Sequence, residues 1–282
     1  MKPVVYTAVS SLRHPGAFLR TFFGDLFGRR TWYLATQLAR RNITATYRRA
    51  FLGYVWAVLP AVALALGLSL AAKNQIVQFG QTSISYTVYV LIGFVLWQTF
   101  IDALTGPMNA LSESRNILAR INVPKEALIL GKVGEILFGL GAKAILVAVV
   151  LAWYGMGPSW QALLVPVGVI TIVALGTALG LILTPVGLLY DDVRRMVPLA
   201  AQVGLIITPV VFVPPSSGTF SSIVMANPIT PLIVTTRDWL TGQPAILHSD
   251  FWVITGCTLF LLIVGFLGVR LVAPFAIERI SS

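Results

Sequence analysis

The chain has 282 residues, of which 57% are hydrophobic and 11% are charged. This balance excludes an ordinary soluble domain. Several apolar runs reach the ~20 residues that a helix needs to cross a bilayer, which predicts an all-α integral membrane protein. The net charge of +10 does not indicate a nucleic-acid-binding protein, because the basic residues lie mainly between the apolar runs.

Residues 1–30 are expected to form a polar cytoplasmic extension. Residues 31–282 are expected to form a single transmembrane domain, whose first element is a helix over residues 31–50. At 100° per residue an apolar stripe lies opposite Arg41 and Arg48, which predicts a helix lying in the membrane interface. The stripe consists of Trp32, Ala39, Ile43 and Tyr47, although Leu34 and Leu38 lie on the arginine side.

Four arginines precede the first apolar run, as the pairs Arg40-Arg41 and Arg48-Arg49. The simplest interpretation is a topology signal that keeps this segment in the cytoplasm. A second interpretation is that they contact a lipid surface or a cytoplasmic partner.

Six spans are predicted, at residues 52–72, 84–105, 128–154, 162–185, 196–214 and 251–273. This arrangement places both termini on one side, together with 16 of the 20 lysines and arginines when Arg270, at the end of the sixth span, is counted with them. By the positive-inside rule that side is the cytoplasm. We therefore expect a multi-pass membrane protein with both termini cytoplasmic.

The cytoplasmic segment between the second and third spans is predicted to contain a short helix. Asn109, Ser112 or Ser114 can cap its start, and Pro124 can end it before the third span. The alternative is a surface turn without a partner.

The third span carries three charged residues. Lys132 and Glu135 are three residues apart and are expected to pair on one helix face. Lys143 lies ~16 Å from Tyr154, close to the middle of the membrane, where a charged group usually faces a bundle interior or a wet path. It could line such a path, or snorkel, or pair with Glu135.

Most aromatic residues near the span ends are typical of interfacial belts. Trp97 lies well inside its span and is a candidate for stacking on sugar rings. In the short loop before the fifth span, Asp191 and Asp192 stand beside Arg194 and Arg195, and ion pairing with helix capping explains them.

The external segment at residues 215–250 becomes apolar again after a Pro/Ser/Gly start, and Pro228 and Pro231 interrupt it. One or two short helices that dip into the outer leaflet are predicted, and a lid of interfacial helices is the alternative.

No enzymatic site is evident in the sequence. A phosphate loop of the form GxxxxGK[ST] is absent, so the chain is not expected to bind ATP by a P-loop. His14 and His248 lie on opposite sides of the predicted membrane, so no metal site is expected. A lipid-modifying membrane enzyme would need a clustered polar site, whereas the acids are scattered. A proton-coupled transporter would need acidic or histidine partners for Lys143.

The stretch RNITATYRRAFLGYVWAVLP resembles the signature of polysaccharide-export permeases of the type-2 ABC exporter superfamily. Further matches follow in family order: residues 116–118 with 124–125, residues 190–193 with Pro198 and Gln202, residues 208–214, and Asn227-Pro228. The Asp191-Asp192 pair departs from the Arg before Asp that the family often has, and the extension before residue 30 is longer than in many members.

The resemblance implies an interfacial helix, six spans, a cytoplasmic coupling helix and re-entrant external gate helices. It implies a homodimer in the bacterial inner membrane that binds two copies of an ATPase subunit, which uses ATP and Mg, so this chain holds no cofactor. The implied substrate is an undecaprenyl-linked glycan such as O antigen, capsule or teichoic acid. An exporter of a drug, peptide or lipid from the same superfamily is the alternative.

On this basis we expect three groups of site residues. The substrate-path candidates are Arg41, Arg48, Tyr54, Trp56, Trp97, Lys143 and Phe212. The candidates for coupling to the ATPase are Ser112, Arg115, Asn116, Arg120 and Pro124. The external-gate candidates are Asn227, Pro228 and Trp239.

Overall fold

A computed structural model describes residues 24–48, 55–74, 82–114, 123–215 and 217–281. Within these ranges the regular structure is helical. The helices are α2 (Arg29–Arg48), α3 (Val55–Lys73), α4 (Tyr86–Glu113), α6 (Lys125–Trp153), the 3₁₀ helix η2 (Trp160–Leu164), α7 (Val165–Leu189), α8 (Asp191–Ile207), α9 (Thr219–Ala226), α10 (Ile229–Thr241) and α11 (His248–Ser281).

Four helical segments in the described part of the chain are long and apolar enough to cross a membrane. They are Tyr86–Glu113, Lys125–Trp153, Trp160–Leu189 and His248–Val272. The expected first span corresponds to a shorter apolar helix, Val58–Lys73, and the expected fifth span to α8, which is not among the four. The all-helical membrane fold is supported, and the prediction of six full spans is not confirmed.

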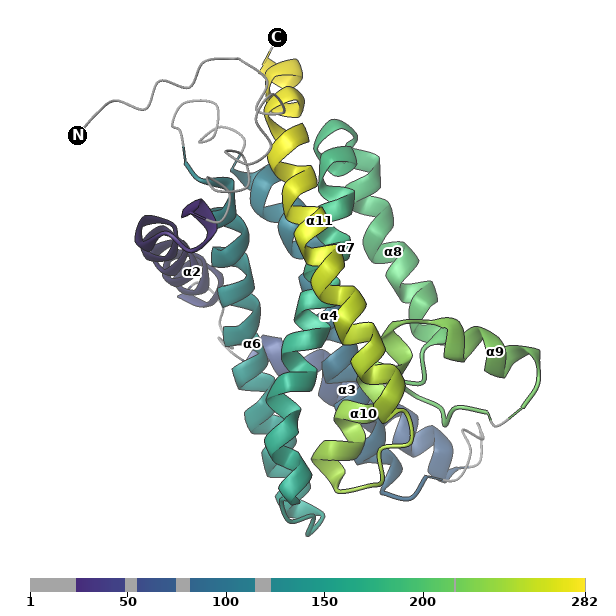
Figure 1. Cartoon of the computed structure of the whole chain (residues 1–282). Helices are drawn as coiled ribbons and strands as arrows, with labels where there is room; N and C mark the ends of the chain where they lie inside the picture. The colour runs from purple at the N-terminus through teal and green to yellow at the C-terminus, as the bar shows by residue number, and fades with distance from the viewer. Residues whose placement is uncertain (1–23, 49–54, 75–81, 115–122, 216, 282) are drawn as a thin grey trace.

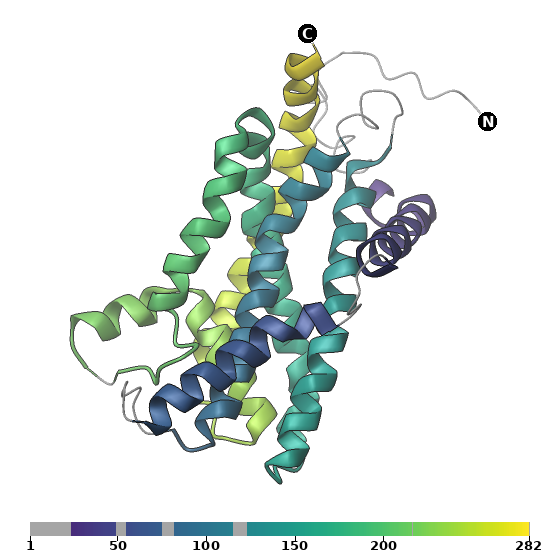
Figure 2. The same cartoon turned by 180° about the vertical axis from the view of Figure 1, so that it is seen from behind.

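The long helices α4, α6, α7 and α11 form an elongated bundle, with α8 running beside it (Figure 1). The C-terminal end of α4, the start of α6 and the α7–α8 junction lie near the C-terminal end of α11. The opposite end carries α10 and the α6–η2 connection (Figures 1 and 2). The predicted cytoplasmic segments thus gather at one end of the bundle, although the membrane orientation itself stays a prediction.

Small residues bring α7 into close contact with its neighbours. A Cβ added at Gly176 would lie 2.7 Å from both the Ala103 Cβ and the Phe100 carbonyl oxygen. One added at Gly180 would overlap the Leu104 carbonyl oxygen. The GTALG sequence of α7 therefore acts as a GxxxG packing motif, in which two helix backbones approach closely.

We expect Gly180→Ala to lower the thermal unfolding midpoint of the purified protein, because the methyl group would push α7 away from α4 at a cost of roughly 1–3 kcal/mol. Gly141→Ala on α6 is the matched control, since no heavy atom lies within 4 Å of its added Cβ. An equal midpoint for both variants would contradict this packing.

The interfacial helix prediction corresponds to α2, which lies across α6 (Figure 1). The face that packs against α6 overlaps the predicted stripe only in part, because Ala39 lies against Gly134 while Trp32 is exposed. Ala35 of the same face is buried. A Cβ at Gly131 of α6 would lie 3.1 Å from the Ala35 carbonyl oxygen and 3.1 Å from the Leu38 Cβ. Leu38, which did not fit the stripe, therefore packs against α6.

The helix ends at two expected connections differ from the prediction. Residues 107–113 continue α4 through Pro107, so Asn109 and Ser112 lie inside α4 and do not cap a new helix. The rest of the predicted short helix, residues 115–122, lies outside the described residues. The loop expected at residues 186–195 is reduced to Tyr190, because α7 continues to Leu189 and α8 begins at Asp191. Two acids in the first turn of α8 favour a helix start at that point.

Candidate functional site

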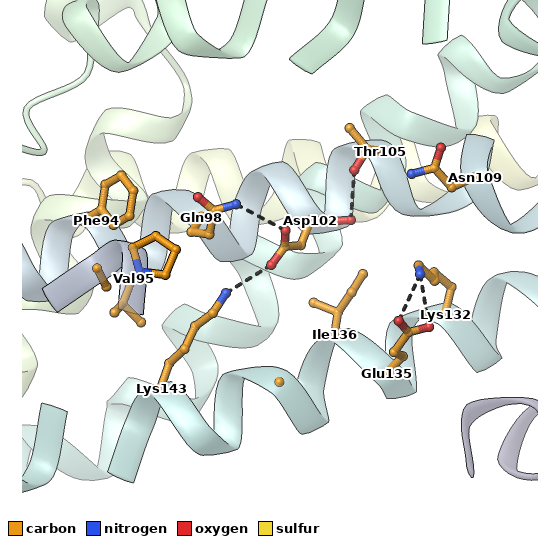
Figure 3. A pocket seen from close by; sticks show the side chains of 13 residues that line it. Phe94, Val95, Gln98, Asp102, Thr105, Asn109, Lys132, Glu135, Ile136 and Lys143 are labelled. Atoms are coloured by element: carbon orange, nitrogen blue, oxygen red, sulfur yellow. Dashed lines mark hydrogen bonds and ion pairs between the residues drawn. The ribbon is translucent and has the colours of Figure 1, made fainter. Parts of the chain in front are cut away.

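The described helices line a partly open cavity of about 370 Å³ with both polar and apolar walls. It lies between α4 and α6, and Pro60 and Ala61 of α3 also line it. On α4 the polar lining residues are Gln98, Asp102, Thr105 and Asn109, and on α6 they are Lys132, Glu135 and Lys143. The other described lining residues are Phe94, Val95, Ile136 and Gly139 (Figure 3).

The polar residues of each helix recur at helical spacing. On α4 they are separated by four, three and four residues, so they follow one face of the helix. On α6, Lys132, Glu135 and Lys143 likewise share the face that looks onto the cavity (Figure 3). The site therefore consists of two facing polar stripes inside a bundle that is otherwise largely apolar.

Lys143 is paired with Asp102 across the cavity. Its Nζ lies 3.0 Å from the Asp102 Oδ2, and Gln98 donates to the Asp102 Oδ1 at 3.4 Å. The Lys143 side chain is 8% exposed, whereas that of Asp102 is 40% exposed. A carboxylate exposed within a span needs polar surroundings, so the cavity is expected to be wet or to hold a polar ligand.

A second pair lies nearer the start of α6. Lys132 and Glu135 are 3.0 Å apart, which confirms the predicted pair. Asn42 of α2 donates to the Glu135 Oε2 at 3.3 Å, and Arg41 donates to the Asn42 Oδ1 at 3.3 Å. Arg41 is thus connected to the cavity through two hydrogen bonds, although it does not line it.

Lys143 is among the residues that line the cavity. Pairing with Glu135 was one expected alternative for it, but the acid that it pairs with is Asp102. Among the described lining residues the aromatic one is Phe94, and Trp97 does not line the cavity. Trp97 is buried against α8, where a Cβ added at Gly204 would lie 3.1 Å from its ring.

The segment that follows α8 is held in place by hydrogen bonds to its backbone carbonyls. Tyr86 donates to Val211 and Tyr89 donates to Phe212, both at 2.8 Å. Arg237 of α10 donates to Pro209 at 3.1 Å. Phe212 is therefore fixed through its backbone, and its ring lies 5.6 Å from that of Phe220.

Arg237, which the sequence placed in an external loop, is 2% exposed. Its guanidinium carbon lies 3.6 Å from the centre of the Tyr89 ring, a cation–π contact. Its neighbour Asp238 lies in α10, outside the four candidate spans. Burial raises the pKa of Asp238 to about 6, and the charge of Arg237 opposes that shift. The position of Arg237 was missed because no local pattern reveals the ring that covers it.

The external segment forms two short helices, α9 and α10, as predicted, and their depth in a membrane stays a prediction. Asn227 lies between them, where its Oδ1 accepts from the Ile229 N–H and its Nδ2 donates to Thr208. Pro228 is the N-cap residue of α10. Trp239 is buried against Phe251, with the two ring centres 4.8 Å apart.

Of the coupling candidates, Ser112 lies near the end of α4 and accepts a hydrogen bond from Arg194 at 2.8 Å. Pro124 is the N-cap residue of α6. Arg194 also pairs with Asp191 at 3.5 Å, as predicted. The remaining predicted positions lie outside the described residues: Arg115, Asn116, Arg120 and Tyr54 entirely, and Arg48 and Trp56 in their side chains.

A further charged cluster, also missed by the sequence analysis, connects three parts of the chain. Arg270 of α11 lies 2.7 Å from Asp25 and 3.6 Å from Glu126 at the start of α6. In the described residues no group of three or more His, Cys, Asp or Glu side chains could hold a metal ion.

No family model matches the chain. An O-antigen export system permease protein (RfbA) of Myxococcus xanthus is 26% identical over 180 residues, which cover 64% of this chain and 68% of that protein. The protein of the same name from Klebsiella pneumoniae is 25% identical over 215 residues, 73% of this chain and 79% of that protein. The chain is therefore a distant homologue of the O-antigen export system permeases, which confirms its resemblance to the type-2 ABC permeases.

Proposed function

We propose that the chain is the transmembrane permease subunit of an ATP-driven exporter that moves a lipid-linked polysaccharide, such as O antigen or capsular glycan, across the bacterial inner membrane. The observation that carries the proposal is the similarity to two O-antigen export permeases over roughly two thirds of the chain. The helical bundle with a polar interior supports it, because a transport protein needs polar surfaces inside an apolar shell.

The proposed complex contains two copies of this chain and two copies of a separate ATPase subunit. The sequence supports a separate ATPase, since it carries no phosphate loop of its own. ATP and Mg would then be bound by that subunit. We expect both termini of this chain in the cytoplasm, on the same side as the ATPase.

The end of α4 is the proposed contact for the ATPase. Ser112 connects it to Arg194 of α8, so a displacement at this end would reach two helices of the bundle. The following residues, Arg115, Asn116 and Arg120, are proposed to belong to the same contact. Movement of α2 would reach the polar cavity by a second route, through the hydrogen bond from Asn42 to Glu135.

We expect the double variant Arg41→Gln, Arg48→Gln to reduce export at least tenfold while leaving membrane insertion and dimerisation intact. The reason is that these cations are proposed to meet the ATPase or the anionic head of the lipid carrier. Export is measured as surface glycan in cells, and insertion by membrane fractionation. If insertion were lost, the two arginines would be topology signals alone.

Co-purification tests the proposed function. We expect the tagged chain to retain an ATPase subunit encoded near it in the genome, and the reconstituted complex to hydrolyse ATP faster when undecaprenyl-linked glycan is present. A chain that purifies without any ATPase, and whose transport does not depend on ATP, would contradict the proposal.

A further inference from the structure

The charges that line the cavity between α4 and α6 balance each other. Two lysines, Lys132 and Lys143, face two acids, Asp102 and Glu135, among the described lining residues. Each lysine lies 3.0 Å from its acid. A phosphate or another anion placed against either lysine would also lie close to the paired carboxylate, which repels it. The cavity is therefore a poor match for an anionic group by itself.

A hydroxyl group fits the same pairs without separating them. The Lys143 ammonium has three donors, and a carboxylate such as that of Asp102 has about four acceptor positions, so each keeps capacity beyond the pair. A hydroxyl can accept from the one and donate to the other at the same time. The 40% exposure of the Asp102 side chain leaves room for this contact.

The uncharged lining residues have the same mixed character. The side-chain amides of Gln98 and Asn109 each offer donors and an acceptor. The hydroxyl of Thr105 donates to the Ile101 carbonyl at 2.9 Å, which leaves its oxygen able to accept. Both stripes thus offer donors and acceptors, as a ligand with many hydroxyls requires.

The dimensions indicate an extended ligand. Gln98 and Asn109 are eleven residues apart on α4, as are Lys132 and Lys143 on α6, which corresponds to ~16 Å of helix. The volume of about 370 Å³ falls within the ~300–1,000 Å³ of small-molecule sites. Phe94 offers an aromatic ring near the Gln98 end (Figure 3).

A hydrocarbon chain is the least suitable occupant. Lipid tails in contact with Asp102 and Lys143 would remove the remaining hydration of a charge pair without any compensating bond. Water alone could fill the space, and it is the alternative that the experiment has to exclude.

We infer that the cavity between α4 and α6 is a binding site for an uncharged, hydroxyl-rich stretch of the exported molecule, that is, for a short run of its sugar residues. This inference rests on the proposed function. It assigns sugar contacts to Asp102, Lys143, Thr105 and Asn109, and assigns none to the lipid-facing side of α6.

The experiment is photo-crosslinking in the chain's own host cells, with the full-length protein. Benzoylphenylalanine is introduced at Asn109 or, in a second variant, at Thr105. After illumination the chain is purified, oxidised with periodate and labelled with aminooxy-biotin, which marks any attached carbohydrate that carries adjacent hydroxyl groups. The matched control is benzoylphenylalanine at Ile145 of α6, which is 69% exposed on the outside of the bundle.

We expect a carbohydrate label on the Asn109 and Thr105 variants at least fivefold above that of the Ile145 variant. The label should disappear in cells that cannot synthesise the glycan. Surface glycan is measured in the same cells. If glycan is exported and neither cavity position carries a label above control, the site is wrong and the cavity holds water. A different result would contradict the proposed function itself. This is the case if cells that lack the gene for this chain still export glycan and the wild-type chain binds no ATPase.

Discussion

Asp102→Asn is expected to destabilise the protein more than Lys143→Gln, although both break the same ion pair. The reason is the difference in burial, since Lys143 is 8% exposed and Asp102 is 40% exposed. Removing the acid leaves a buried ammonium without its counter-ion. Removing the lysine leaves a carboxylate that still reaches the polar cavity.

The size of this effect follows from the burial of the charge that remains. Breaking a fully buried pair costs ~3–5 kcal/mol. Because Asp102 is partly exposed, water already weakens the pair, and the expected cost of Asp102→Asn is roughly 2–3 kcal/mol. Lys143→Gln should cost about 1 kcal/mol. The double variant should cost less than the sum, because asparagine and glutamine can bond to each other.

The measurement is the thermal unfolding midpoint of the three variants in one detergent, with surface glycan measured in parallel. Both single variants should also reduce export. Lys132→Gln is a useful comparison, because Lys132 lines the same cavity and pairs with Glu135. After this substitution Glu135 still accepts a hydrogen bond from Asn42. Equal midpoints for Asp102→Asn and Lys143→Gln would show that the pair is solvated on both sides.

The second large effect is expected at Tyr89, which covers the buried Arg237. Tyr89→Leu removes the ring beneath the guanidinium, worth ~2 kcal/mol when desolvated, together with the hydrogen bond to the Phe212 carbonyl. Together with the loss of aromatic volume, the expected decrease in the free energy of unfolding is roughly 4 kcal/mol. Tyr89→Phe keeps the ring and loses only the hydrogen bond, at about 1 kcal/mol.

The two Tyr89 variants separate the ring from the hydroxyl, which makes the comparison informative. Thermal unfolding in detergent is the measurement, and Tyr33→Leu on α2 is the control, because Tyr33 is 64% exposed. Its midpoint should stay close to that of the wild type. Should Tyr89→Phe be as damaging as Tyr89→Leu, the hydroxyl and not the cation–π contact would hold Arg237 and the segment after α8.

The apolar runs of the sequence predicted the helices well and their lengths poorly. Hydropathy indicates which segments can form a helix in lipid, but it does not show how steeply the helix crosses the membrane. Thus α3 runs obliquely across α4, and α4 continues through Pro107 (Figure 2). Neighbouring helices can satisfy the backbone groups that a proline frees, so proline is a weak end signal in a membrane bundle.

The charged residues of the site were partly predictable. Lys132 and Glu135 are neighbours on one helix turn, so their pairing follows from the sequence alone. The pairing of Lys143 with Asp102 joins residues 41 apart on two helices and depends on how those helices are aligned. The polar spacing of Gln98, Asp102, Thr105 and Asn109 was the available signal, since four polar residues on one face of a span indicate a buried polar contact.

Transport in proteoliposomes that contain this chain and the proposed ATPase subunit tests the export function. Undecaprenyl-linked glycan from the host is placed on the ATPase side, and the amount that becomes accessible to a glycosidase inside the vesicle is measured. We expect accumulation that requires ATP and Mg and that stops when the ATPase carries an inactivating substitution. Accumulation without ATP, or none with an active ATPase bound, would show that the chain is not an ATP-driven exporter subunit.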